Sequence, residues 1–144
     1  MKTKMKILIV EDDIFCAKLL KFYLNNLEYA AAVNVSTGPK AIAAAREINP
    51  DIIFMDIILI GEIDGISAAK EIRENDKEVL IVFVSAYDDQ NIISKASKTY
   101  PIAYITKPYE QNKIQTVMQI AEKILAQKKL NPTIAAEPVE MQII

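Results

Sequence analysis

The amino-acid sequence predicts an α/β fold in which helices cover both faces of one parallel sheet. Five short apolar runs alternate along the chain with five segments that carry apolar residues at helical spacing. The runs are rich in Ile and Val and apolar at consecutive positions, as is typical of strands buried on both faces of a parallel sheet. Repeated strand–helix units of this kind are joined by right-handed crossovers, so we expect one open sheet.

The predicted strands are short and evenly distributed along the chain. They are residues 5–10, 31–35, 51–55, 79–84 and 102–105. Five strand–helix units are most simply accommodated by a flavodoxin-like (βα)5 doubly wound sandwich with a parallel sheet of strand order 2-1-3-4-5. Ligands of such open sheets bind beyond the carboxyl ends of the strands. The residues that directly follow the predicted strands are therefore the candidates for a functional site.

The segments between the apolar runs predict amphipathic helices. The first helix has an apolar face formed by Ile14, Ala17, Leu20, Leu24 and Leu27. The second begins near Pro39, which suits a first helical turn, and ends before Pro50. The third and fourth are expected at about 65–75 and 89–98, and the fifth at about 110–128. The buried stripe of the fifth helix is expected to comprise Ile114, Val117, Ala121 and Ile124.

The helical pattern stops near residue 129. Residues 1–128 are therefore expected to form one domain, and residues 129–144 a tail or a linker stub. The tail contains Pro132 and Pro138, shows no clear period, and ends in an apolar tip at 141–144. It is too short for a domain, and we expect it to be either a linker or a segment that docks on its own or a neighbouring chain.

The composition excludes several classes of function. The 144 residues include no histidine, one cysteine, and 17 basic against 19 acidic side chains. Without histidine there can be no Ser-His-Asp or Cys-His site and no His-ligated zinc, and Cys16 alone cannot form an internal disulfide. A net charge of −2 provides no basic field for nucleic acid. Without a signal peptide or a membrane span of ~20 apolar residues, a cytoplasmic protein is expected.

Acidic residues follow two of the predicted strands. Glu11, Asp12 and Asp13 come after the first strand, and Asp56 comes after the third. Asp12 or Asp13 alone would be explained by capping of the next helix. Asp56, however, lies within a long apolar run, where a carboxylate is costly unless it is paired or liganded. Carboxylates brought together in this way hold a proton or bind a cation, and oxygen ligands favour Mg²⁺.

A hydroxyl and a lysine lie at the ends of the fourth and fifth predicted strands. Ser85 ends the fourth run, and Lys107 follows the fifth. Each is explained singly by a helix cap or a turn, but together with the acids they suit phosphoryl transfer to a carboxylate. Asp56 would be the nucleophile, Mg²⁺ would offset the charge, and Ser85 and Lys107 would hold the phosphoryl oxygens.

The ordered motifs resemble the receiver domain of two-component response regulators. The resemblance covers about residues 5–126. It is carried by ILIVEDD at 7–13, FMD at 54–56, residues 59–61 with Asp64-Gly65, VSA at 84–86 and YITKPY at 104–109. Ser85 stands where threonine is more frequent in the family, which keeps the hydroxyl.

The resemblance implies a role for each matching residue. It implies that Asp56 is the phosphoacceptor and that Ser85 and Lys107 bind the phosphoryl group. The implied Mg²⁺ ligands are Glu11, Asp12, Asp56 and the backbone carbonyl of Ile58, whereas Asp13 matches no site position. Ser85 and Tyr104 would form a switch, the bond before Pro108 would be cis, and Ile58 and Tyr87 would set the lifetime of the phosphorylated state. Since Ile58 is apolar and Tyr87 bulky, slow hydrolysis is expected.

The same resemblance implies partners. Because the chain has no histidine, the phosphoryl donor would be a histidine kinase, a phosphotransfer protein or a small phosphodonor. Phosphorylation would alter the face made by the fourth helix, fifth strand and fifth helix, where Ile92 or Ile93 could contact a partner or a second copy in a homodimer, or be ordinary surface residues. No direct contact with nucleic acid or membrane, and no turnover of a separate substrate, is expected.

Three alternatives compete with this interpretation. A haloacid-dehalogenase-type phosphatase needs a second acid two positions after the nucleophile, where this chain has Ile58. A flavodoxin-like cofactor binder needs a phosphate cradle, but the loop after the first strand is acidic. A phosphorylation-independent pseudo-receiver that acts as a protein-interaction module is the strongest alternative, because an intact site need not be used. The chain includes no output domain, so it is either free-standing or part of a larger regulator or hybrid kinase.

Overall fold

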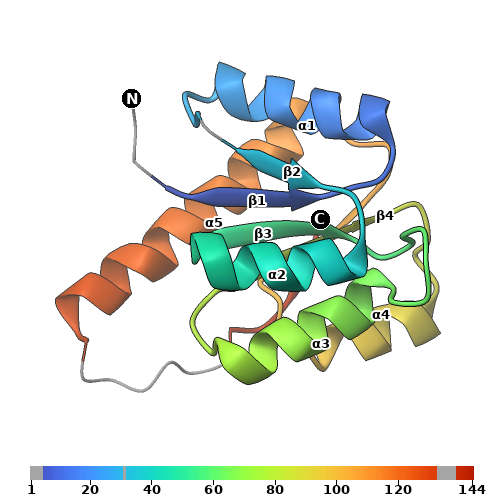
Figure 1. Ribbon diagram of the computed structural model, residues 1–144. Helices are drawn as coiled ribbons and strands as arrows, with labels where there is room; N and C mark the ends of the chain where they lie inside the picture. Colours follow the sequence, from blue (N-terminus) through green and yellow to red (C-terminus); the bar gives the residue numbers. More distant parts are fainter. Residues whose placement is uncertain (1–4, 31, 133–138) are drawn as a thin grey trace.

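The computed structural model describes residues 5–30, 32–132 and 139–144 (Figure 1). These residues form one parallel sheet with the strand order β2-β1-β3-β4-β5-β6. The strands are β1 (Ile7–Val10), β2 (Val33–Val35), β3 (Ile52–Asp56), β4 (Leu80–Ser85), β5 (Ala103–Thr106) and β6 (Gln142–Ile143). The predicted order 2-1-3-4-5 is confirmed for the first five strands, and β6 adds a sixth at the edge beside β5.

Five helices cover the two faces of the sheet. They are α1 (Ile14–Asn26), α2 (Gly38–Ile48), α3 (Gly65–Asn75), α4 (Gln90–Ser97) and α5 (Gln111–Leu130). One hydrophobic cluster packs α1 and α5 against one face of the sheet, and a second cluster packs α2, α3 and α4 against the other. Figure 1 shows these two layers on either side of the strands. The three-layer arrangement is the doubly wound sandwich that the sequence predicts.

The central strands contribute alternate side chains to the two clusters. In β4, Val82 and Val84 face the α1/α5 side, and Ile81 and Phe83 face the opposite side. All residues of β1, β3 and β4 are buried. Successive side chains of a strand point to opposite faces, so burial on both faces requires the consecutive apolar residues seen in the sequence.

Aspartate and threonine side chains define where four helices begin. Asp13, Thr37, Asp64 and Asp89 each accept a hydrogen bond from a backbone N–H three residues on, at the N-termini of α1, α2, α3 and α4. Such a cap is worth about 1 kcal/mol. Asp13 is therefore a helix cap, which distinguishes it from the two acids that precede it.

Two predicted features need correction. Ile14 was expected on the buried face of the first helix, but it is 67% exposed. It lies in the first turn, next to the loop that leaves the end of β1, and the buried stripe begins only at Ala17. The second strand was expected at residues 31–35, but β2 covers only Val33–Val35, and residue 31 lies outside the described residues. Since β2 is an edge strand, its residues are more exposed than those of the central strands.

The tail forms an element that the sequence does not predict. α5 continues to Leu130, and Gln142–Ile143 then pair with β5 in parallel. The apolar tip at 141–144 thus pairs with β5 of its own chain. Pro138 lies outside the described residues. Among the helices of the described residues, none is both long enough and apolar enough to cross a membrane.

Candidate functional site

Four strands deliver the candidate residues to one edge of the sheet. Glu11 and Asp12 directly follow β1, Asp56 is the last residue of β3, Ser85 is the last residue of β4, and Lys107 directly follows β5. Because β1 lies next to β3 and β4 next to β5, the carboxyl ends of these strands meet at one place. This is the position at which open α/β sheets bind their ligands.

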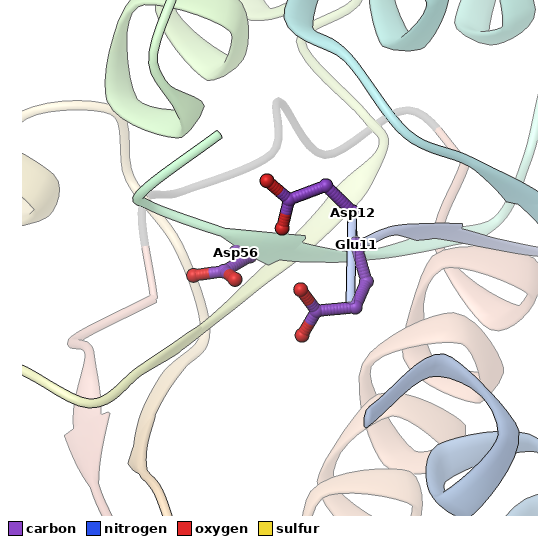
Figure 2. A group of neighbouring side chains, drawn as sticks. All are labelled: Glu11, Asp12 and Asp56. Atoms are coloured by element: carbon purple, nitrogen blue, oxygen red, sulfur yellow. The ribbon is translucent and has the colours of Figure 1, made fainter. Parts of the chain in front are cut away.

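Three carboxylates gather at this edge. Glu11, Asp12 and Asp56 each have a carboxylate oxygen within 4.8 Å of the others. Figure 2 shows the three side chains directed into a common space. Glu11 is only 7% exposed and Asp56 only 8%, so two of the charges are largely shielded from water. Burial raises the pKa of Glu11, the neighbouring Asp56 raises it further, and Lys107 opposes the change.

Lys107 neutralises part of this negative charge. Its Nζ atom lies 2.5 Å from Oε1 of Glu11 and 3.2 Å from Oδ2 of Asp56. Burial alone lowers the pKa of Lys107, but the hydrogen bond to Glu11 and the charge of Asp56 outweigh it and raise this pKa above its ordinary value. Lys107 is therefore protonated, and positively charged, at neutral pH. The peptide bond between Lys107 and Pro108 is cis.

Backbone N–H groups orient each carboxylate. The amide of Ile58 donates to Oδ1 of Asp56, and that of Ile60 donates to Oδ2 of Asp12, each at 3.2 Å. The amide of Asp13 donates to Oε2 of Glu11, also at 3.2 Å. The loop after β3 thus holds its own acid and one from the loop after β1, so the two loops fix the geometry together.

Gly65, for which the sequence predicts no individual role, packs against the backbone of Asp56. The amide of Gly65 donates to the carbonyl oxygen of Ile57 at 2.7 Å. A Cβ atom at position 65 would overlap with the backbone carbonyl of Asp56. Only glycine permits α3 to begin this close to the end of β3. One feature of the sequence could have indicated a role for Gly65. The chain has only three glycines, and one of them belongs to the Asp64-Gly65 motif.

Ser85 and Tyr104 are joined through the backbone of Tyr87. The Oγ atom of Ser85 accepts a hydrogen bond from the amide of Tyr87 at 3.1 Å, and the hydroxyl of Tyr104 donates to the carbonyl of the same residue at 2.5 Å. Both side chains are fully buried. Burial raises the pKa of the Tyr104 hydroxyl. The sequence predicts that Ser85 acts together with Tyr104, but the part played by the Tyr87 backbone appears only in the structure.

Exposed apolar side chains lie in the segments around this edge. Ile14 and Phe15 open α1 and are 67% and 83% exposed. Ile58 and Ile60 follow Asp56, Tyr87 follows Ser85, and each is at least half exposed. We call Ile14, Phe15, Ile58, Ile60 and Tyr87 the apolar rim. Phe15 is not among the residues singled out from the sequence, although an apolar residue off the buried stripe of an amphipathic helix is a detectable signal.

The donor set fits a hard divalent cation. Three carboxylates are available, and oxygen ligands are those that Mg²⁺ prefers. A cation between them would offset the repulsion that Lys107 only partly relieves. The same edge also presents a hydroxyl and an ammonium group, which are suited to the oxygens of a phosphoryl group.

Comparison with known proteins points to one family. Residues 7–119 match the family model for the response regulator receiver domain. The chain is 30% identical over 118 residues to the chemotaxis protein CheY of Thermotoga maritima, and the match covers 82% of this chain and 98% of that protein.

Solved structures give the same result. The chain is similar to the signal receiver domain of a modulated diguanylate cyclase from Desulfovibrio desulfuricans, with a TM-score of 0.77, 27% identity, and coverage of 89% of this chain and 98% of that chain. It is also similar to the receiver domain of a sensor histidine kinase from Pseudomonas aeruginosa, with a TM-score of 0.73, 29% identity, and coverage of 82% and 97%. The latter structure has a magnesium ion coordinated in its active site cleft.

Proposed function

The chain belongs to the response regulator receiver domain family, and from this premise we propose that Asp56 accepts a phosphoryl group in a two-component phosphorelay. The observation that carries the proposal is the contact of Lys107 with both Glu11 and Asp56, in a site where Asp12 completes a carboxylate cluster. A buried carboxylate at a strand end, next to a protonated lysine, is a nucleophile with its charge compensation already in place.

The proposed reaction transfers the group from nitrogen to oxygen. A carboxylate oxygen of Asp56 attacks the phosphorus of a phosphohistidine, the P–N bond breaks, and the imidazole nitrogen keeps the electron pair and takes up a proton. The product is an acyl phosphate on Asp56. Lys107 and the hydroxyl of Ser85 would then bind phosphoryl oxygens.

A magnesium ion would be held by Glu11, Asp12, Asp56 and the backbone carbonyl of Ile58. When bound, it supplies positive charge that offsets the charges of the phosphoryl group and the carboxylates. The amides of Ile58 and Ile60 keep two of these carboxylates in place before the cation arrives, so little reorganisation is needed.

The phosphohistidine donor lies outside these 144 residues, because they include no histidine. The apolar rim favours a protein donor, a histidine kinase or a phosphotransfer protein, since a small anionic donor would gain nothing from exposed Phe15 or Ile60. After transfer, Ser85 would move toward the phosphoryl group, Tyr104 would respond through Tyr87, and the face formed by α4, β5 and α5 would change its partners.

The proposal is tested by incubating the protein with Mg²⁺ and acetyl phosphate and measuring its intact mass. We expect one phosphoryl group on the parent protein and none on the Asp56→Asn variant. The matched control is Asp13→Asn, which removes a neighbouring carboxylate but keeps a capping side chain, and it should be labelled like the parent. Equal labelling of Asp56→Asn and the parent would contradict the assignment.

A pseudo-receiver would behave differently in the same experiment. The chain would bind Mg²⁺ through its carboxylates but would take up no phosphoryl group from acetyl phosphate or from any phosphorylated histidine kinase. The contact of Lys107 with Asp56 favours the phosphoacceptor over this alternative, because the same ammonium group could pair with a phosphoryl group on Asp56.

A further inference from the structure

The outer edge of β5 is occupied by the end of the described chain. The amide of Gln142 donates to the carbonyl of Ile102, and the amide of Ile144 donates to the carbonyl of Tyr104, both at 3.0 Å. β6 is parallel to β5, with Gln142 beside Ala103 and Ile143 beside Tyr104. We call residues 141–144 the tail segment. An exposed strand edge is a template for pairing, and here it is covered by the protein itself.

The tail segment also covers both faces of this edge. Met141 packs against the cluster that contains Tyr104, and Ile144 packs against the cluster on the opposite face of the sheet. Gln142 and Ile143 are exposed. The pairing spans only two residues of each strand, and two partly buried side chains add to it, so the contact is small enough to be reversible.

A chain of hydrogen bonds leads from the candidate site to the tail segment. Ser85 Oγ accepts from the amide of Tyr87, the carbonyl of Tyr87 accepts from the hydroxyl of Tyr104, and the carbonyl of Tyr104 accepts from the amide of Ile144. Tyr104 is thus bound by its side chain to the loop after β4 and by its backbone to the tail segment. Two residues, Tyr87 and Tyr104, therefore connect Ser85 with the tail segment.

We propose that the outer edge of β5 is a binding site for a short extended apolar segment, that the tail segment occupies it in the unphosphorylated protein, and that phosphorylation of Asp56 releases it. The release step rests on the proposed function. A Ser85 hydroxyl drawn toward a phosphoryl group leaves the amide of Tyr87, which loosens the loop that anchors the Tyr104 hydroxyl. Tyr104 is then held less firmly, and its backbone carbonyl is the acceptor for the amide of Ile144 in the tail segment.

The tail segment, when it is paired with the outer edge of β5, blocks this edge for binding partners. β5 is part of the face, with α4 and α5, through which a partner or a second copy is proposed to bind. While the tail segment is paired with β5, that edge is closed to any other strand. Release would open it, so the tail segment would act as an internal competitor for the output face.

Amide hydrogen exchange of the full chain tests this inference. Beryllofluoride with Mg²⁺ serves as the phosphoryl mimic, and exchange at Gln142 is measured with and without it by NMR. We expect Gln142 to be protected in the free protein and to exchange at least about tenfold faster with the mimic, the size of a typical coupling between two sites. Uptake of beryllofluoride with unchanged protection at Gln142 would overturn the inference while leaving the proposed function intact.

Two proline variants provide a matched pair. Ile144→Pro removes the amide that donates to Tyr104, whereas Ile143→Pro alters a residue whose amide points away from β5, because successive amides of a strand face opposite sides. Ile144→Pro should remove protection at Gln142 without the mimic, and Ile143→Pro should retain it. By linkage, Ile144→Pro should also bind beryllofluoride more tightly than Ile143→Pro, and equal affinities would contradict the coupling.

The remaining outcomes are also distinguishable. If no variant binds beryllofluoride or takes up phosphate, the proposed function fails and the release step fails with it. If protection of Gln142 rises with protein concentration, the edge is paired with the tail segment of a second copy, and the internal occupant proposed here is wrong.

Discussion

The ammonium nitrogen of Lys107 lies 2.5 Å from Oε1 of Glu11, and the same nitrogen reaches Oδ2 of Asp56 at 3.2 Å. One lysine is therefore the internal counter-ion of two carboxylates in a cluster of three. A bound cation would pair with the same two carboxylates, so it would compete with the positive charge of Lys107. This relationship links the metal affinity of the site to its ability to accept a phosphoryl group.

Replacement of this lysine should affect the two properties in opposite directions. In Lys107→Met the carboxylates lose their counter-ion, so Mg²⁺ should bind about tenfold more tightly, while phosphoryl uptake should fall sharply. Because the chain has no tryptophan, isothermal titration calorimetry is the suitable measurement. The control is Lys128→Met, which removes an ion pair with Glu78 far from the site. Weaker Mg²⁺ binding by Lys107→Met would contradict this electrostatic account.

The close approach of Gly65 to β3 predicts a large difference between two glycine substitutions. Gly65→Ala places a methyl group on the carbonyl of Asp56 and should lower the free energy of unfolding by about 3 kcal/mol. Gly61→Ala meets no neighbouring atom, but Gly61 has φ of 108°, so this variant should lose only about 1 kcal/mol. Urea denaturation measures both values, and equal losses would show that the contact with Asp56 does not constrain position 65.

Alkaline pH should destabilise the protein partly through Tyr109. Burial raises the pKa of Tyr109 above its ordinary value of 10.0, so the folded state holds this proton more tightly than the unfolded state. The free energy of unfolding should therefore fall as pH rises above about 10. Lys107, whose pKa is also raised, acts in the same direction. Tyr109→Phe should show a smaller fall than Tyr100→Phe, which alters an exposed tyrosine.

The phosphorylated state should be long-lived. Ile58 is 51% exposed and Tyr87 is 53% exposed, and both belong to the apolar rim. Neither side chain can activate water as a carboxylate or amide could, and Tyr87 is bulky. After removal of the phosphodonor, loss of the group should take minutes or longer, and the double variant Ile58→Asn/Tyr87→Ala should lose it faster. A half-life of seconds for the parent protein would argue against this role.

The sequence predicts the central strands and their order well because burial on both faces forces consecutive apolar residues. The carboxyl ends of β3 and β4 are also predictable, because the polar residues Asp56 and Ser85 interrupt the apolar runs there. Ile14 was placed wrongly because helical periodicity does not show where a helix extends past the sheet that it covers.

Other features depend on contacts that no local pattern contains. The pairing of Gln142–Ile143 with β5 joins segments far apart in the chain, and two paired residues leave no recognisable strand pattern. The carbonyl of Tyr87 and the tight packing of Gly65 are backbone features, which side-chain identity does not reveal. Arg73 is a further example, since its guanidinium binds the carbonyls of Val79, Thr99 and Tyr100.

The central claim is that the carboxylate of Asp56 becomes an acyl phosphate. It is tested most directly by reducing the protein with borohydride after treatment with Mg²⁺ and acetyl phosphate, because borohydride converts an aspartyl phosphate to homoserine. Peptide sequencing by mass spectrometry then identifies the modified position. The account predicts homoserine at position 56 and unmodified carboxylates at Glu11, Asp12 and Asp13. Homoserine at another position, or none at all in protein that has bound Mg²⁺, would contradict it.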